Sequence, residues 1–189
     1  MPLPRFYRLP DDRRETILRV ARAHFARDGA DRASYNKIIA ELGISKTSAY
    51  QYFDGKEDLF AAVIEDVHTR ILHTLGDWPP AHTPEQFRRQ LRDASDRLVT
   101  HGLTHPEDLA LLDATTAQDP APWLAPVIDN GRALGVIRTD VDRDLMLTAT
   151  AAVLRAADLW TAARLRDGAT APDLTWSLIE GLWSTPHES

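Results

Sequence analysis

Residues 34–53 read Ser-Tyr-Asn-Lys-Ile-Ile-Ala-Glu-Leu-Gly-Ile-Ser-Lys-Thr-Ser-Ala-Tyr-Gln-Tyr-Phe, and this stretch decides the fold. It holds two short helical patterns that meet at Gly43, whose missing side chain permits the left-handed backbone of a sharp reversal. Ser34 and Ser45 stand where each short helix would need an N-terminal cap. A longer helix is predicted before them, over residues 12–28. Together the three segments have the plan of a helix-turn-helix.

The second short helix, predicted over residues 46–53, has an outward surface of one chemical kind. Every side chain on it can donate a hydrogen bond and none is acidic: Lys46, Thr47, Ser48, Tyr50, Gln51 and Tyr52. Such a surface suits the major groove of DNA, where donors meet phosphates and base edges. Many helical hairpins bind nothing, and the hairpin alone would favour that interpretation. The acid-free surface and the clustered lysines bring the two interpretations near even.

The charge is distributed unevenly over the 189 residues, whose net charge is -6. Residues 1–60 carry 11 Lys and Arg against 9 Asp and Glu, whereas residues 61–189 carry 11 against 19. All the lysines fall in the first part, at Lys37, Lys46 and Lys56. A mildly basic head and an acidic body predict two separate tasks. The arm Arg5-Phe6-Tyr7-Arg8 either reaches the DNA backbone or is a solvated terminus, and the sequence leaves both open.

Helical periodicity continues through the body. A long fourth helix is predicted from Lys56 to about Leu75, with no internal Gly or Pro. Later helices include an eighth from Asp142 to about Arg166 and a ninth that opens at Pro172. No segment alternates with period two for long enough to form a strand. The prediction is an all-α fold of about nine helices.

Three motifs at fixed spacing resemble the DNA-binding head of the TetR family of bacterial transcriptional regulators. They are Gly43-Ile44-Ser45-Lys46, Tyr50-x-Tyr52-Phe53 and Lys56-Glu57-Asp58-Leu59. The resemblance covers roughly residues 12–60, and the rest of the chain resembles the family only through its helical character and length. It implies a helix-turn-helix DNA-binding domain over residues 1–55 and a ligand-binding and dimerisation domain over residues 56–189.

The resemblance also implies roles for single positions. Tyr50 and Lys56 match positions that bind backbone phosphates, and we favour this role for Tyr50 although helical spacing does not exclude a core aromatic. Lys46, Ser48 and Tyr52 match positions that touch base edges or phosphates. The expected DNA contacts are Tyr35, Asn36, Lys46, Thr47, Ser48, Tyr50, Gln51, Tyr52 and Lys56. The partner is double-stranded DNA with a palindromic operator.

The predicted eighth helix is rich in small residues. It holds seven alanines, at positions 149, 151, 152, 156, 157, 162 and 163. Small side chains permit close helix packing, so this helix and the ninth could pair two subunits in an isologous interface. We therefore predict a homodimer, which would bring two heads to successive major grooves. The alternative is that these helices only complete the core of one subunit.

A small-molecule effector in the body is the second expectation from the resemblance. Five tryptophans lie in the body, and aromatic side chains suit an apolar pocket. The candidate pocket residues are Val63, Val67, His68, Ile71, Trp123, Asp158, Trp160 and Arg164. A ligand wedged against the fourth helix could tilt it as a lever and change the spacing of two heads. The alternative is a filled core with no ligand.

Enzymatic chemistry has no support in the sequence. The chain lacks cysteine, Gly-x-Ser-x-Gly and His-Glu-x-x-His, and Gly102 and Pro106 interrupt the helix that a His101–His105 metal site would need. We expect no enzyme activity, no cofactor and no metal. The start has no signal-peptide pattern and residues 145–154 are too short to cross a membrane, which predicts a cytoplasmic protein. The predicted function is a ligand-responsive repressor released from its operator by a small molecule; the alternative is a helical protein–protein interaction module without DNA binding.

Overall fold

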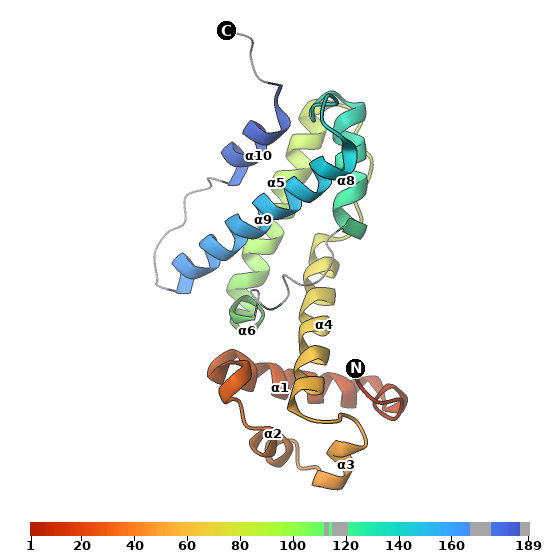
Figure 1. The fold of residues 1–189 in the computed structure, drawn as a ribbon, viewed down its shortest axis with the longest axis vertical. Helices are drawn as coiled ribbons and strands as arrows, with labels where there is room; N and C mark the ends of the chain where they lie inside the picture. The colour runs from red at the N-terminus through yellow and green to blue at the C-terminus, as the bar shows by residue number, and fades with distance from the viewer. Residues whose placement is uncertain (112–113, 115–120, 167–174, 186–189) are drawn as a thin grey trace. The chain divides into compact units, whose positions relative to one another are not determined.

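A computed structural model describes residues 1–111, 114, 121–166 and 175–185, and all its elements in these ranges are helical. They are η1 (Phe6–Arg8), α1 (Asp11–Arg32), α2 (Tyr35–Glu41), α3 (Lys46–Tyr50), α4 (Lys56–Leu75), α5 (Pro84–Thr104), α6 (Pro106–Ala110), α8 (Ala121–Ala133), α9 (Arg143–Arg166) and α10 (Thr175–Trp183) (Figure 1). The all-α prediction of about nine helices is confirmed, because the described ranges hold nine α-helices beside the short 3₁₀ helix η1.

The chain forms two compact units. Unit 1 comprises Met1–Ile71 and Gly102–Thr115, and unit 2 comprises Leu72–His101 and Thr116–Ser189. The helices α4 and α5 therefore each contribute residues to both units. The functional division expected at residues 55 and 56 remains a prediction.

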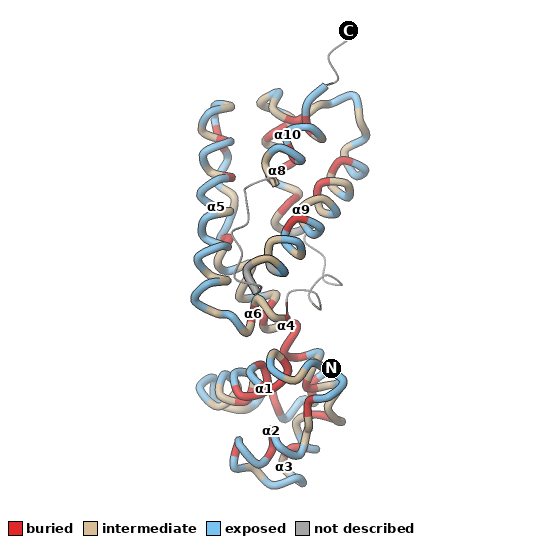
Figure 2. The backbone as a smooth tube through the Cα atoms, turned by 90° about the vertical axis from the view of Figure 1, so that its left-hand side faces the viewer, coloured by how far each residue is buried: buried red, intermediate tan, exposed pale blue. Residues whose placement is uncertain are grey.

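Unit 1 has a core built from apolar stripes of α1, α2 and α4. The predicted stripe of the fourth helix lies in it: Leu59 is 1% exposed, and Val63 and Val67 are fully buried. α1 packs against both α2 and α6. In Figure 2 these buried positions form red segments along the helices of unit 1. The helix predicted over residues 12–28 spans Asp11–Arg32 and is kinked at Gly29, whose φ is +76°.

A group of buried charges also holds unit 1 together. Arg22 of α1 is 5% exposed and pairs with Asp66 of α4 at 2.6 Å and with Asp108 of α6 at 3.2 Å. Asp108 is 1% exposed and accepts a further bond, 2.8 Å long, from Arg70 of α4. Burial raises the pKa of Asp66 above its usual value, against the opposing charges of Arg22 and Arg70. These pairs tie three helices that are distant in sequence.

Unit 2 has a separate core, where α8 and α10 pack against α9. Gly131 of α8 allows the closest approach in this core, because a Cβ there would lie 2.5 Å from the Cδ1 atom of Ile137. The buried indole of Trp183 donates a 3.0 Å hydrogen bond to Thr150 of α9. Buried segments of α9 and α10 are visible in Figure 2.

The ends of the later helices follow local signals. Asp142 caps α9, since its carboxylate accepts bonds of 2.9 and 3.1 Å from the backbone N–H groups of Asp144 and Leu145. The helix ends at Arg166, as predicted. The start predicted at Pro172 lies outside the described residues. Of the helices described, none is long and apolar enough to cross a membrane.

Candidate nucleic-acid interface

The reversal between α2 and α3 is built by one glycine and two serine caps. Gly43 has a φ of +62°, the left-handed conformation predicted for it. Ser34 accepts a bond from the Lys37 N–H at the start of α2, and Ser45 accepts a 3.0 Å bond from the Ser48 N–H at the start of α3. Because both caps lie within the hairpin, its backbone geometry is determined locally.

The packing side of the hairpin is apolar, as the sequence predicts. Ile38 is fully buried and Ala49 is 2% exposed, and Leu42 is also buried. Ile44 is half-buried and packs against the core of unit 1. The small side chain of Ala49 lets α3 pack close to α2 while its opposite surface stays open.

The predicted outward residues, which we call the α3 surface, are Lys46, Thr47, Ser48, Tyr50, Gln51 and Tyr52. Four of them are exposed, whereas Ser48 and Tyr52 are half-buried. The helix itself ends at Tyr50, earlier than the predicted Phe53, because the chain tightens into a turn in which the Gln51 N–H bonds to the Ser48 carbonyl. Gln51 and Tyr52 therefore belong to the turn after α3.

Tyr50 and Tyr35 form a pair at the edge of the α3 surface. Their rings are 5.7 Å apart in an edge-to-face arrangement. Tyr50 is 53% exposed, so it is not the core aromatic that its spacing also allowed. Tyr35 is half-buried, and its shielded hydroxyl has no hydrogen-bond partner among the described residues. Burial raises the pKa of Tyr35 to about 12.

The remaining predicted DNA contacts differ in accessibility. Asn36 is exposed in the first turn of α2. Lys56 is half-buried, and its Nζ donates a 2.8 Å bond to the Asp31 carbonyl near the end of α1. The ammonium group thus binds the backbone at the junction of α1 and α4, where it can present its other hydrogens to an anion.

The N-terminal arm packs against the rest of unit 1, which excludes the solvated terminus and leaves contact with DNA a prediction. Phe6 is 4% exposed and packs 4.8 Å from the ring of Phe53, and the Leu3 N–H bonds to the Tyr52 carbonyl at 2.8 Å. The arm is therefore not a solvated terminus. Arg5 and Arg8 remain exposed on it. A three-residue 3₁₀ turn has too few positions to show periodicity, and the apolar Phe6 was its only signal.

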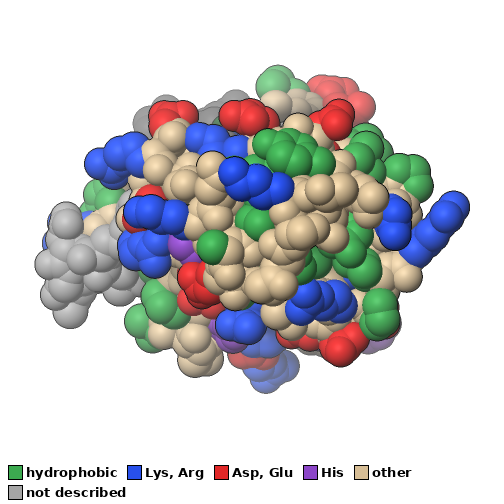
Figure 3. Space-filling view, turned by 90° about the horizontal axis from the view of Figure 1, so that it is seen from below, with side chains coloured by type: hydrophobic (Ala, Val, Ile, Leu, Met, Phe, Trp, Pro, Cys, Tyr) green, Lys and Arg blue, Asp and Glu red, His purple; other side chains and the backbone are tan. Residues whose placement is uncertain are grey.

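Figure 3 shows the face that is seen from below in Figure 1, where α2 and α3 lie. Lys and Arg side chains occur at many points of this face, together with acidic, apolar and uncharged polar ones. The face is therefore mixed in charge, and freedom from acidic groups is a property of the α3 surface.

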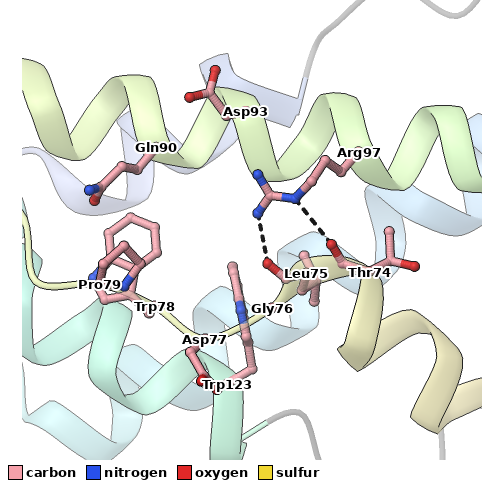
Figure 4. Close-up of a pocket in the computed structure, with 10 residues that line it drawn as sticks. All are labelled: Thr74, Leu75, Gly76, Asp77, Trp78, Pro79, Gln90, Asp93, Arg97 and Trp123. Atoms are coloured by element: carbon pink, nitrogen blue, oxygen red, sulfur yellow. Dashed lines mark hydrogen bonds between the residues drawn. The ribbon is translucent and has the colours of Figure 1, made fainter.

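The candidate ligand residues are divided between the two units. Val63, Val67, His68 and Ile71 belong to unit 1, and Trp123, Asp158, Trp160 and Arg164 belong to unit 2. Asp158 is exposed, and Trp160 is 41% exposed with the Arg164 guanidinium 5.0 Å from its ring centre. Of the eight, Trp123 lines a described pocket. This pocket measures about 350 Å³ and also includes Trp78, Gln90 and Arg97 (Figure 4).

The fold and the α3 surface define a class of protein: a helical chain whose N-terminal helix-turn-helix has the form used to read DNA. Residues 17–63 match the family model described as "Bacterial regulatory proteins, tetR family". A 58-residue segment is 34% identical to YdgC, an uncharacterised HTH-type transcriptional regulator of Bacillus subtilis (strain 168). That match covers 31% of this chain and 30% of YdgC.

Solved structures resemble the chain over both units. A TetR-like transcriptional regulator from Rhodococcus sp. RHA1 is 26% identical with a TM-score of 0.59, and the match covers 93% of this chain and 96% of that one. A TetR-family regulator from Pectobacterium atrosepticum has the same fold, with a TM-score of 0.64 at 23% identity over 95% of this chain and all of the other. The TetR family model therefore matches the helix-turn-helix of unit 1, and solved TetR-like structures share the fold of the chain.

Proposed function

We propose that the protein is a TetR-family regulator that binds a palindromic operator as a homodimer, represses transcription there, and is released by a small molecule. The α3 surface carries the proposal: it presents donors without any acidic side chain, on a hairpin held by two serine caps. Lys46 is the exposed cation of that surface. A cation at the start of a recognition helix can bind a guanine edge or a phosphate.

The test of DNA binding begins with duplexes selected from a randomised library, because the operator is unidentified. Gel shifts with the selected sequence then compare wild type with Lys46→Ala and with Arg92→Ala, which removes an exposed charge from α5 in unit 2. Lys46→Ala is expected to weaken binding by about 1–3 kcal/mol if the side chain reads a base. Arg92→Ala is expected to bind like wild type. Failure of the wild type to select any sequence would favour the protein–protein interaction module.

The proposed dimer uses α9 and α10. A stripe of α9 is largely open to solvent, with Leu145 59% exposed and Ala152 and Ala156 also exposed. Leu178 of α10 is 57% exposed. Ala156→Arg tests the interface, because a charge on this stripe would oppose close packing of two helices. We expect wild type to sediment as a dimer and the variant as a monomer with reduced operator binding; a dimeric variant would refute this interface.

Repression and ligand release are proposed because both are typical of TetR-family regulators. Their test is a reporter gene under the selected operator, which should be silent with the protein present and expressed after release. Activation of the reporter would contradict repression. Since regulation requires access to the chromosome, we also propose that the protein works in the cytoplasm.

A further inference from the structure

Tyr35 and Tyr50, which we call the tyrosine pair, join α2 to α3 in unit 1. Tyr35 is the first residue of α2, and Tyr50 is the last residue of α3. The two helices contact each other and lie next to one another in Figure 1. The ring centres are 5.7 Å apart, and the ring planes are inclined at 65°. Aromatic pairs prefer this edge-to-face geometry, because the positive edge of one ring meets the negative face of the other.

One ring of the tyrosine pair is anchored. Tyr35 is half-buried and packs against the hydrophobic core of unit 1. Its hydroxyl is shielded from solvent and has no hydrogen-bond partner among the described residues. The structure therefore uses the ring of Tyr35, and its hydroxyl is not exposed to an incoming phosphate.

The other ring is open to solvent. Tyr50 is 53% exposed, and the chain turns directly after it, where the Gln51 N–H bonds to the Ser48 carbonyl at 3.1 Å. An exposed side chain can occupy several rotamers, and binding becomes weaker when it has to lose that freedom. The anchored ring of Tyr35 limits the rotamers of Tyr50 before DNA binds.

The orientation of Tyr50 matters because of its neighbour on α3. Lys46 and Tyr50 are four residues apart and share one side of the helix, and both are exposed. An ammonium group and a phenol hydroxyl on one side present two donors to the DNA backbone. They can act together only if the Tyr50 side chain stays beside α3.

We propose that Tyr35 is a positioning residue for DNA binding: its anchored ring holds the Tyr50 side chain so that the Tyr50 hydroxyl donates to a backbone phosphate. Tyr35 acts through Tyr50 and not through its own hydroxyl. The proposal rests on the proposed function for DNA binding and deepens it. Since phosphates carry no base identity, the effect of Tyr35 is independent of the DNA sequence.

Three single variants separate the ring of Tyr35 from its hydroxyl. Tyr35→Leu removes the ring and keeps an apolar side chain that favours helix, whereas Tyr35→Phe removes only the hydroxyl. Phe60→Leu is the matched control, because Phe60 is a half-buried ring of α4 that stands edge-to-face with Phe25, 4.9 Å away. Circular dichroism establishes that each variant is folded. Fluorescence anisotropy then gives its affinity for the selected operator and for an unrelated duplex over a series of salt concentrations.

We expect Tyr35→Leu to weaken binding to both duplexes by the same factor, about 2- to 10-fold, the value of one side chain that must be immobilised. Tyr35→Phe and Phe60→Leu should stay within about twofold of wild type. A loss in Tyr35→Phe equal to that in Tyr35→Leu would overturn the proposal and indicate direct contact of the Tyr35 hydroxyl with DNA.

The salt dependence distinguishes positioning from general damage to the hairpin. Tyr50 carries no charge and releases no counterion from DNA, so Tyr35→Leu should leave the slope of log affinity against log salt unchanged. Lys46→Ala should reduce the magnitude of this slope by about 1. A reduced slope in Tyr35→Leu would show that Lys46 is displaced as well, and would overturn the specific link to Tyr50.

A double-mutant cycle tests that link directly. Tyr50→Phe removes the hydroxyl that Tyr35 is proposed to position. In the Tyr50→Phe background, Tyr35→Leu should therefore weaken binding by less than about twofold, because residues that act as one unit are not additive. Additive losses would refute the positioning role.

The ring contact is measured without DNA, in protein labelled with ¹³C-tyrosine. The Tyr50 ring signals, assigned by their loss in Tyr50→Phe, should shift in Tyr35→Leu and stay in place in Phe60→Leu; unshifted signals in Tyr35→Leu would overturn the pair. A wild type that binds its operator while the cycle is additive would refute the role of Tyr35 and leave the regulator intact. A wild type that selects no DNA would refute the proposed function, and the positioning role with it.

Discussion

Replacing Arg22 by Met tests whether the buried charges hold unit 1 together. The Arg22 side chain is 6% exposed and lies within 4 Å of three carboxylates: Asp66 at 2.6 Å, Asp108 at 3.2 Å and Glu107 at 3.9 Å. Loss of one partner from a buried pair typically costs about 3–5 kcal/mol. We expect about 3 kcal/mol, the lower end of that range, because Asp108 keeps Arg70, and Asp66 and Glu107 are 27% and 31% exposed.

The assay is urea unfolding followed by two signals. All five tryptophans lie in unit 2, so their fluorescence reports that unit, whereas far-UV circular dichroism reports the helices of both. Arg22→Met should lower the free energy of unfolding seen by circular dichroism and change the fluorescence transition less. Arg19→Met is the control, since Arg19 is exposed on the same helix, and a change within about 0.5 kcal/mol is expected. Equal effects of the two substitutions would refute the structural role of the charge group.

The loss of unfolding free energy caused by Arg22→Met should also depend on pH. The pKa of Asp66 is raised in the folded protein, so the folded state binds its proton more readily than the unfolded state does. Stability from this group is therefore lost as the pH rises from the usual carboxyl range through the raised pKa. Removal of Arg22 takes away a charge that favours the ionised form and raises this pKa further. The deficit is expected to be largest at neutral pH and to shrink as the pH falls toward about 4; a pH-independent deficit would contradict this account.

Five further substitutions test single features. Gly43→Ala should lower the free energy of unfolding by about 1–2 kcal/mol, because Gly43 has a positive φ. Gly181→Ala should raise it by up to about 1 kcal/mol, because Gly181 lies in α10 with open space around it. Thermal unfolding measures both variants. Gly131→Ala should cost about 1–3 kcal/mol, measured in the fluorescence transition, because its Cβ would lie 2.8 Å from Phe87. Tyr50→Phe should weaken binding to all operators about equally in gel shifts, whereas Tyr35→Phe should gain about 1 kcal/mol of stability on losing an unpaired buried hydroxyl.

The features predictable from the sequence are those with a local cause. Gly43 and the two serines determine the hairpin within a dozen residues, and the acid-free α3 surface follows from which side Ile38 and Ala49 face. The capping of α9 by Asp142 is likewise local. These capping bonds do not depend on the rest of the fold, because the capping side chain and the backbone N–H groups that it binds belong to the same turn.

The missed features depend on residues that are far apart in the chain. Arg22 has the spacing of an ordinary helical residue, and only the fold brings Asp66 and Asp108 to it. The docking of Phe6 on Phe53 is equally long-range. The sequence does contain a signal for Trp78. It is a large aromatic residue in a segment that breaks a helix, and such a residue in a turn indicates packing against distant parts of the chain.

The stripe of α4 shows that a correct helix prediction does not by itself identify a ligand site. Helical periodicity shows that Val63 and Val67 share one side of α4, but packed core and pocket lining produce the same pattern. Both residues are fully buried within the core of unit 1, so a ligand beside them would have to displace packed side chains. The end of α4 differs, because Leu75 lines a pocket and its carbonyl is bound by Arg97. Arg97 of α5 therefore holds the end of α4 by hydrogen bonds, whereas Val63 and Val67 are held by packing in the core.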